Sequence, residues 1–420
     1  MKTNIYKQLT ISGVILMGMS ATSMSVQADD ALMEALTSGK VDFSFRPRYE
    51  FVEDDSKTDD GDAFTVRSTL GYKTGSFHNV FGYIQFENTT DVLSDTQYND
   101  TRNGRGTLPT IADPSGTEIN QAFLGGTFMN DTLVKVGRQI ITPRAAPFHR
   151  FLGTVLWRQN WQTQDSITVT NTSLPDTTLL AGYIWNNNTI FGTDRDMSAP
   201  ILNAQYKGLK YVNLEGYYYD LEFDDLPGLS TETYGLRADG GFPIFKEGTR
   251  LIYTAEYAMQ EEGGNSAASY DADYYLFEGG FKTRFDGMFI KSLMAKVSYE
   301  VLESAGDGVN AFKTPLATGH AFQGWADNFL ATPAAGIEDT YFTVVATGAY
   351  DTKLIVSYHM LEAENAGFDY GDELDIWFTK KFAKHYTVGL KYAGYDASSD
   401  VGNPKSTDLS KYWAYFTFKY

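Results

Sequence analysis

The chain has 420 residues, a formal net charge of −19 and no cysteine. This acidity argues against a nucleic-acid partner, and the absence of cysteine excludes disulfides and thiolate metal sites. Aromatic residues nevertheless make up 15% of the chain, whose mean hydropathy is −0.31. A polar chain rich in large amphipathic rings is typical of a transmembrane β-barrel, in which such rings form girdles at both membrane interfaces.

Residues 1–28 have the features of an export signal. Lys2 and Lys7 provide a basic start, an apolar segment too short to span a bilayer follows, and a small-residue cleavage site ends at Ala28. We therefore predict a signal peptide over 1–28 and a single barrel domain over 29–420. A short membrane anchor is the weaker alternative, because no second long apolar segment follows.

Alternation of polar and apolar residues predicts strands along the rest of the chain. At its end, the side chains from Tyr412 to Tyr420 in steps of two are apolar, while Lys411 and Lys419 lie on the other face. The same period occurs in 41–51. A soluble sandwich would also alternate, but here charged residues oppose continuous apolar rows and no helical segment covers those rows. Lipid is the simplest cover.

The connections between these segments are short and long in strict alternation. The long ones are polar and include 53–62, 88–118, 140–164, 186–200 and 302–337. Nine long and eight short connections separate 18 strands, which places both termini in the periplasm of an outer membrane. The alternative is 16 strands, because boundaries read from sequence shift by about 2–4 residues. Such a barrel is too wide for its own side chains to fill, so we expect an aqueous, conducting interior.

Charged residues at the inward phase of the strands are the first candidates for a pore lining. Both signs occur, which keeps a pore wet and lets a charged solute move between partners without one deep trap. The alternative for each residue is that paired charges only hydrate and stiffen the lumen. The candidates on the strands are Arg46, Arg48, Arg67, Arg237, Arg250, Arg284, Glu256, Glu300 and Asp375.

The third long connection is unusual because it concentrates four arginines and two tryptophans within Gly137–Ser166. Pro143 and Pro147 stop the flanking strands from extending into it, and its FLGTVLW segment is too apolar for a freely solvated loop. Such a loop can fold inward and narrow a wide barrel. Arginine suits a carboxylate-bearing solute, because its fork makes bidentate contacts and stays charged. The alternative is that these arginines bind acidic loops or lipopolysaccharide phosphates at the rim.

Signatures of catalysis and metal binding are weak. The five histidines lie far apart in sequence without metal-ligand spacing, and no Ser/His/Asp set falls at matched heights in the barrel. The acidic loop at 53–62 fits no defined calcium-binding motif. We therefore expect no enzymatic activity, no cofactor and no metal.

Three segments resemble the alginate-export family of outer-membrane porins: GRQ…RFLGTVLWRQNWQTQD in the third long connection, Thr318–Phe342 and Tyr358–Phe378. The resemblance implies an 18-stranded barrel that is constricted by inward loops, lined with arginine and crossed passively by an anionic uronic-acid polysaccharide. By matching position, it implies a constriction formed by Arg138, Arg150, Arg158, Asn160 and Asp165. It also implies a loop entering the lumen that contains His320, Trp325, Asp327 and Asp339.

We therefore predict a passive outer-membrane channel for anionic saccharides, either an alginate-like polymer or its oligomers, with no energy input. One alternative is a general or cation-preferring diffusion porin. Another is a surface receptor or adhesin anchored by the barrel. The expected partners are the anionic solute and outer-membrane lipid, including lipopolysaccharide.

Overall fold

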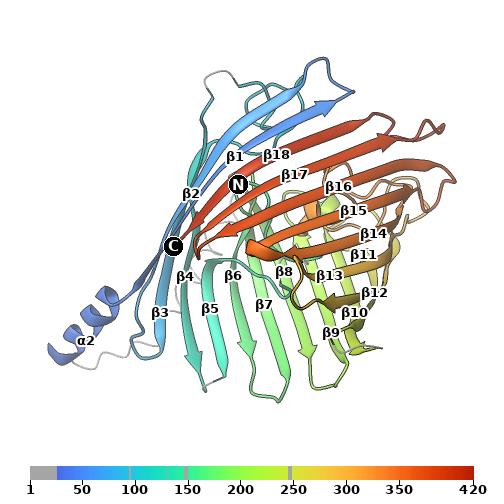
Figure 1. Cartoon of the computed structure of the whole chain (residues 1–420). Helices are drawn as coiled ribbons and strands as arrows, with labels where there is room; N and C mark the ends of the chain where they lie inside the picture. The colour runs from blue at the N-terminus through green and yellow to red at the C-terminus, as the bar shows by residue number, and fades with distance from the viewer. Residues whose placement is uncertain (1–25, 94–95, 130, 146–149, 245–247) are drawn as a thin grey trace.

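The structure is a computed structural model that describes residues 26–420, except 94–95, 130, 146–149 and 245–247. Its main feature is an antiparallel sheet of 18 strands, in which each strand pairs with its neighbours along the chain. Because β1 also pairs with β18, the sheet closes into a barrel (Figure 1). The predicted 18-stranded barrel is confirmed, and the alternative of 16 strands is wrong.

The strands are long and steeply tilted around the barrel (Figure 1). In chain order they are β1 Lys40–Asp54, β2 Gly61–Lys73, β3 Val80–Asp91, β4 Gly116–Phe128, β5 Thr132–Gln139, β6 Thr163–Asn171, β7 Thr177–Asn188, β8 Asp194–Tyr206, β9 Val212–Phe223, β10 Thr231–Pro243, β11 Arg250–Glu262, β12 Asp271–Arg284, β13 Ile290–Leu302, β14 Ile337–Gly348, β15 Thr352–Glu362, β16 Asp369–Phe382, β17 Tyr386–Ala397 and β18 Leu409–Lys419. Within the described ranges, three single-turn 3-10 helices lie at Pro227–Leu229, Gly319–Ala321 and Ala349–Asp351.

The two faces of the wall differ as the alternation predicts. On β2, Thr65 and Arg67 point inward and are buried, whereas the neighbouring Leu70 is 54% exposed on the outer face. Leu236 and Phe277 on other strands are 72% and 54% exposed on the same outer face. A closed sheet satisfies its own backbone hydrogen bonds, and an apolar exterior of this extent needs lipid around it. The protein is therefore an outer-membrane barrel.

Short turns and long loops occupy opposite ends of the barrel. The end where β1 begins and β18 ends has short turns such as 383–385, and the other end has connections as long as 303–336. In outer-membrane barrels the short turns are periplasmic. One predicted boundary is wrong: the connection expected at 186–200 spans only 189–193, because β7 and β8 continue to pair through their polar ends.

Long loops pack into the interior over the outer half of the barrel. Phe151 and Leu152 from one long connection join Phe312 and Leu316 from another in a buried apolar cluster, which also includes Tyr274 of the wall. The width of the barrel made an aqueous interior the expectation. Long loops supply the volume that the wall side chains cannot fill.

A helix, α2 (Val26–Thr37), precedes β1 and extends from the periplasmic end of the wall (Figure 1). It docks through its last turn, where the backbone N–H of Gly75 donates to the carbonyl of Ala35 at 2.8 Å. Among the described residues, no helix has the length and apolar character needed to cross a bilayer. The signal peptide expected at 1–28 lies outside the described residues up to residue 25, and its last three residues begin α2.

Candidate functional site

Three long connections enter the lumen, named by their order at the outer end: loop 2 (92–115), loop 3 (140–162) and loop 7 (303–336). Loop 3 crosses the lumen from side to side. In its first segment (140–145), Arg144 Nε lies 2.9 Å from Glu215 on β9 and Nη2 lies 2.6 Å from Glu256 on β11. Its second segment (150–162), called its second limb below, reaches β1, which lies well away from β9 and β11 in the order of strands around the ring. The arginine-rich loop therefore does fold inward.

The arginines of β1 bind this second limb through its backbone. Arg46 Nη1 donates to the carbonyl of Leu156 at 3.0 Å, and Nη2 donates to the carbonyl of Trp157 at 3.2 Å. Arg48 also donates to the Trp157 carbonyl. These two residues face the lumen, as predicted, but their guanidinium groups hold loop 3 and are not free for a solute.

Six buried charged side chains, named here the six-charge cluster, connect loop 3 to loop 2, to loop 7 and to the wall. Arg158 is its centre: Nη1 lies 3.1 Å from Glu50 on β1, and Nη2 lies 2.8 Å from Asp327 on loop 7. All members are at most 6% exposed, and the three cations balance the three anions. They are Arg48, Arg158 and Lys411, with Glu50, Asp113 and Asp327.

The electrostatics of the six-charge cluster keep its loop members ionised. Burial alone would raise the pKa of the Asp113 carboxyl, but Arg48 and Arg158 lower it below its usual value. Burial alone would lower the pKa of the Arg158 guanidinium, but the facing carboxylates Glu50 and Asp327 raise it above its usual value. Arg158 is therefore a fixed structural cation.

Wall carboxylates hold loop 7 in a similar way. The backbone N–H of Ala326 donates to Glu373 at 2.6 Å, and that of Trp325 donates to Asp375 at 3.2 Å. Glu300 on β13 accepts a hydrogen bond from loop 7 and also faces Arg150 of loop 3, whose Nε lies 3.0 Å away. Glu300 and Asp375 thus occupy the lumen face, where they bind loops.

Lys391 on β17 lies in a cage of four tryptophans, the tryptophan cage. Its Nζ lies 3.8–5.4 Å from the ring centroids, close enough for cation–π attraction. The cage consists of Trp157, Trp325, Trp377 and Trp413. The site predictions did not include it. The available signal was the occurrence of Trp377, Lys391 and Trp413 at inward phases of adjacent strands.

His320 of loop 7 connects the tryptophan cage to the six-charge cluster. Lys391 Nζ donates to His320 Nε2, and His320 Nδ1 donates to Asp327 at 2.6 Å. This pattern needs a neutral imidazole with its hydrogen on Nδ1. Burial, together with the cations Lys391 and Arg158, holds the pKa of His320 well below its usual 6.5, although Asp327 acts to raise it.

Two further predicted residues fasten loop 3 to the wall and to loop 2. Asn160 Oδ1 accepts a hydrogen bond from Thr89 on β3 at 2.7 Å, and its Nδ2 donates to the carbonyl of Pro114 at 2.9 Å. Arg67 pairs with Glu87 and lies 3.8 Å from the ring centroid of Trp161. Asn160 thus ties loop 3 to β3 and to loop 2, and Arg67 contacts loop 3 from the wall.

Arg237 stays within the wall, where Nη1 lies 2.8 Å from Glu256. Asp339 was expected on a loop that enters the lumen, but it lies on β14 and pairs with His359 at 2.8 Å. That expectation is wrong, since only the segment before Ile337 leaves the wall.

Arg138 and Asp165 are not part of the lumen lining. They oppose each other in the β5–β6 register, and Arg138 Nε lies 2.8 Å from Asp165. Their neighbours Gln139 and Gln164 are buried on the inner face, so alternation places the pair on the outer face, where Ile167 is 40% exposed. The expectation that this pair forms the constriction is corrected accordingly.

Arg250 and Arg284 belong to a third group, the basic mouth, at the periplasmic end of the lumen. Eight cationic residues occupy inward phases near the periplasmic ends of seven strands, and all are exposed. Within the described part of the chain, none of the eight forms an ion pair with a carboxylate. The members are Lys40, Lys73, Arg250, Lys282, Arg284, Lys353, Lys381 and Lys419.

Among the described residues, no group of three or more His, Cys, Asp or Glu is placed to hold a metal ion. A closed 18-stranded barrel with an apolar exterior and loops folded into its lumen defines a class: the outer-membrane barrels of the porin type. No protein-family model matches the sequence, and no curated protein matches it.

The chain is similar in fold to solved Occ/OprD-type porins. Pseudomonas aeruginosa OpdK with vanillate has a TM-score of 0.67 and 12% identity over 91% of this chain and 98% of that one. P. aeruginosa OccD3 (OpdP) has a TM-score of 0.65 and 15% sequence identity, and the match covers 92% of each chain. Acinetobacter baumannii OccAB2 has a TM-score of 0.67 and 16% sequence identity, and the match covers 92% of this chain and 99% of that one. These likenesses confirm the predicted 18-stranded barrel fold, whereas the resemblance to the alginate-export family finds no support in these comparisons.

Proposed function

We propose that the protein is a passive channel for anionic solutes, with uronate saccharides of the alginate type as the first candidates. The observation that supports this proposal is the basic mouth. The loop arginines face carboxylates and are neutralised, whereas the eight cations of the basic mouth are exposed and none of them has a carboxylate partner among the described residues. An anion in the periplasmic half of the lumen would therefore meet a favourable potential.

The chemistry of the basic mouth suits passage rather than capture. Lysine ammonium groups are strongly hydrated and flexible, so each binds a carboxylate weakly, and several around one opening let an anion move from one to the next. The solute follows its gradient, and no cofactor or energy input takes part. Packed loops 3 and 7 argue against free diffusion of any small solute, because they occupy the outer half of the lumen.

Ion selectivity in planar bilayers tests the proposal. Under a KCl gradient, the wild-type reversal potential should show a preference for chloride, and added oligouronates should block the current. Replacing Arg250, Lys282 and Arg284 together by Gln should reduce both effects, because these cations lie on the adjacent strands β11 and β12.

A matched control replaces Lys207 and Lys210 by Gln. These two lysines lie on the periplasmic turn between β8 and β9, outside the inward strand positions, and the change should leave selectivity unaltered. A cation preference in the wild type would refute the proposal and support the diffusion porin instead.

A further inference from the structure

An apolar groove of about 520 Å³, named here the wall groove, lies on the outer face of the barrel from β8 to β12. Its floor is low because Ala238 and Ala255, which oppose each other in the β10–β11 register, carry only methyl groups. Larger side chains that are exposed on the outer face form its rim: Tyr206, Leu214, Leu236, Tyr257 and Phe277. The wall groove is therefore a recess in the lipid-facing surface.

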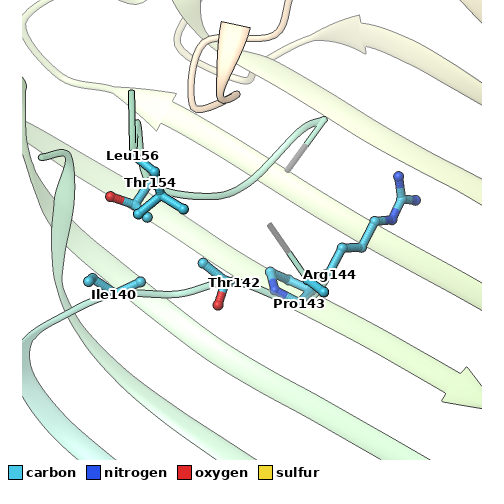
Figure 2. Close-up of a pocket in the computed structure, with 7 residues that line it drawn as sticks. Ile140, Thr142, Pro143, Arg144, Thr154 and Leu156 are labelled. Atoms are coloured by element: carbon cyan, nitrogen blue, oxygen red, sulfur yellow. The ribbon is translucent and has the colours of Figure 1, made fainter. Parts of the chain in front are cut away.

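The wall groove is separate from the path of a solute. The sheet behind it is continuous, because β8 to β12 pair with one another. On the inner side of these strands, Glu215 and Glu256 bind Arg144 of loop 3. The Arg144 side chain extends away from Leu156 of the same loop (Figure 2). A group that binds in the wall groove thus comes from the membrane and not from the lumen.

The register of the strands shows that the wall groove rises from the periplasmic edge of the wall into the membrane. A single row of opposing residues crosses it from β8 to β12: Tyr206, Leu214, Ala238, Ala255 and Phe277. Tyr206 is the last residue of β8, whereas β12 continues from Phe277 to Arg284 before its periplasmic end. One end of the wall groove therefore lies at the periplasmic interface, and the other end lies deeper in the bilayer.

Two lysines lie at the periplasmic end of the wall groove. Lys207 and Lys210 are exposed on the turn that follows Tyr206. Within the described ranges neither forms an ion pair with a carboxylate; Asp176 on the neighbouring turn binds Lys207 through backbone groups, at 2.8 Å.

Aromatic rings beside these lysines indicate their depth in the membrane. Tyr211 and Phe242 are exposed, and their ring centroids lie 6.3 Å apart. Lys210 Nζ lies 4.9 Å from the ring centroid of Tyr211. Because aromatic belts of membrane proteins lie at headgroup level, Lys207 and Lys210 lie at the height of lipid phosphates in the periplasmic leaflet.

A phospholipid presents the matching groups in the matching order, with an anionic phosphate at the interface and an acyl chain that points to the middle of the bilayer. Lysines next to a membrane-spanning segment attract anionic lipids, and about 520 Å³ is within the usual size of ligand pockets, roughly 300–1,000 Å³. We propose that the wall groove binds one anionic phospholipid of the periplasmic leaflet. An acyl chain lies over Ala238 and Ala255, and the phosphate lies beside Lys207 and Lys210. This site is independent of the proposed transport of anions.

Native mass spectrometry of the purified barrel tests the headgroup end of the site. Phosphatidylglycerol and phosphatidylcholine with the same acyl chains are the two probes. The wild type should retain one phosphatidylglycerol and bind phosphatidylcholine more weakly. Replacing Lys207 and Lys210 together by Gln should weaken phosphatidylglycerol binding roughly 10- to 30-fold, which is the effect of two lysines near an anionic headgroup. The matched control replaces Lys291 and Lys384, which are exposed near other periplasmic turns, and should leave binding unchanged.

Filling the floor tests the acyl-chain end. Ala255→Leu and, as a second variant, Ala238→Leu should each reduce binding of phosphatidylglycerol at unchanged Tm, because an apolar side chain on the outer face is compatible with the barrel. Ala414→Leu is the matched control, since Ala414 is exposed on the outer face of β18 and does not line the wall groove.

Four results would overturn the proposal. They are a wild type that retains no phosphatidylglycerol, equal binding of the two lipids, equal losses in the variants and their controls, and a wild-type dimer that Ala255→Leu dissociates. The last result would assign the wall groove to a second copy of the chain.

Discussion

Replacing Arg158 by Met should release loops 3 and 7 from the wall while the barrel itself remains folded. Met is long and apolar, so it fills much of the same space without the charge. Arg158 bridges Glu50 of β1 and Asp327 of loop 7, at 3.1 and 2.8 Å. The barrel strands do not depend on this bridge, because they are held by their own ladder of backbone hydrogen bonds.

The magnitude follows from the charges of the six-charge cluster. Three cations balance three anions, so Arg158→Met leaves one buried negative charge uncompensated. Removing one partner of a buried ion pair typically costs about 3–5 kcal/mol. Since each 1.4 kcal/mol is a factor of ten, the equilibrium for loop docking should shift by roughly two to three and a half orders of magnitude.

Single-channel conductance measures the release, because undocked loops no longer fill the outer half of the lumen. Arg158→Met should increase conductance, and limited proteolysis should cut loops 3 and 7 faster. The double variant Arg158→Met with Glu50→Gln restores neutrality in the six-charge cluster, so its conductance and its rate of proteolysis should lie closer to those of the wild type than those of the single variant do. If Arg158→Met has the same conductance and the same rate of proteolysis as the wild type, the electrostatic reasoning is refuted.

Two further predictions concern loop 7. In docked loop 7 the pKa of His320 is held below 6.5, so as pH falls below 6.5 only a His320 in released loop 7 takes up a proton. Docking of loop 7 should therefore weaken at low pH, and current fluctuations should grow. The variant His320→Gln should remove this pH dependence, and a pH response that persists in the variant would assign the effect to another group. Gly324 has φ +85°, and a Cβ there would collide with the Glu373 carboxylate, so Gly324→Ala should speed proteolysis of loop 7 by roughly fivefold or more. Gly308 in the same loop also has positive φ but no atom within 4 Å of such a Cβ, and Gly308→Ala should therefore have the smaller effect if the collision is what matters.

The wall could be predicted from the sequence because lipid outside and polar groups inside impose a period of two on every strand. Arg67 and Leu70 fall on the faces that this period assigns. The same period already placed Arg138 with Val134 and Val136 on the outer face. The resemblance to a family pattern assigned Arg138 to the lumen, and the local alternation was the better guide.

The partners of the loop arginines could not be predicted, because they are far apart in the chain. Arg158 and Asp327 are separated by 169 positions, and Arg48 and Trp157 by 109. No local pattern encodes such pairs. They depend on how a loop folds after the wall has set the positions of its ends, so the sequence indicated an inward arginine loop but not that its charges would be neutralised.

The position of the six-charge cluster also bears on how the barrel assembles. β1 and β18 are the first and last strands, and their pairing is the seam that completes the cylinder. Arg158 joins Glu50 on one side of this seam to Asp327, which lies 3.4 Å from Lys411 on the other side. The two inner loops therefore act as an internal clasp across the seam. This clasp adds buried ion pairs to the backbone ladder that already closes the seam, so docking of the two loops reinforces the junction between the first and the last strand.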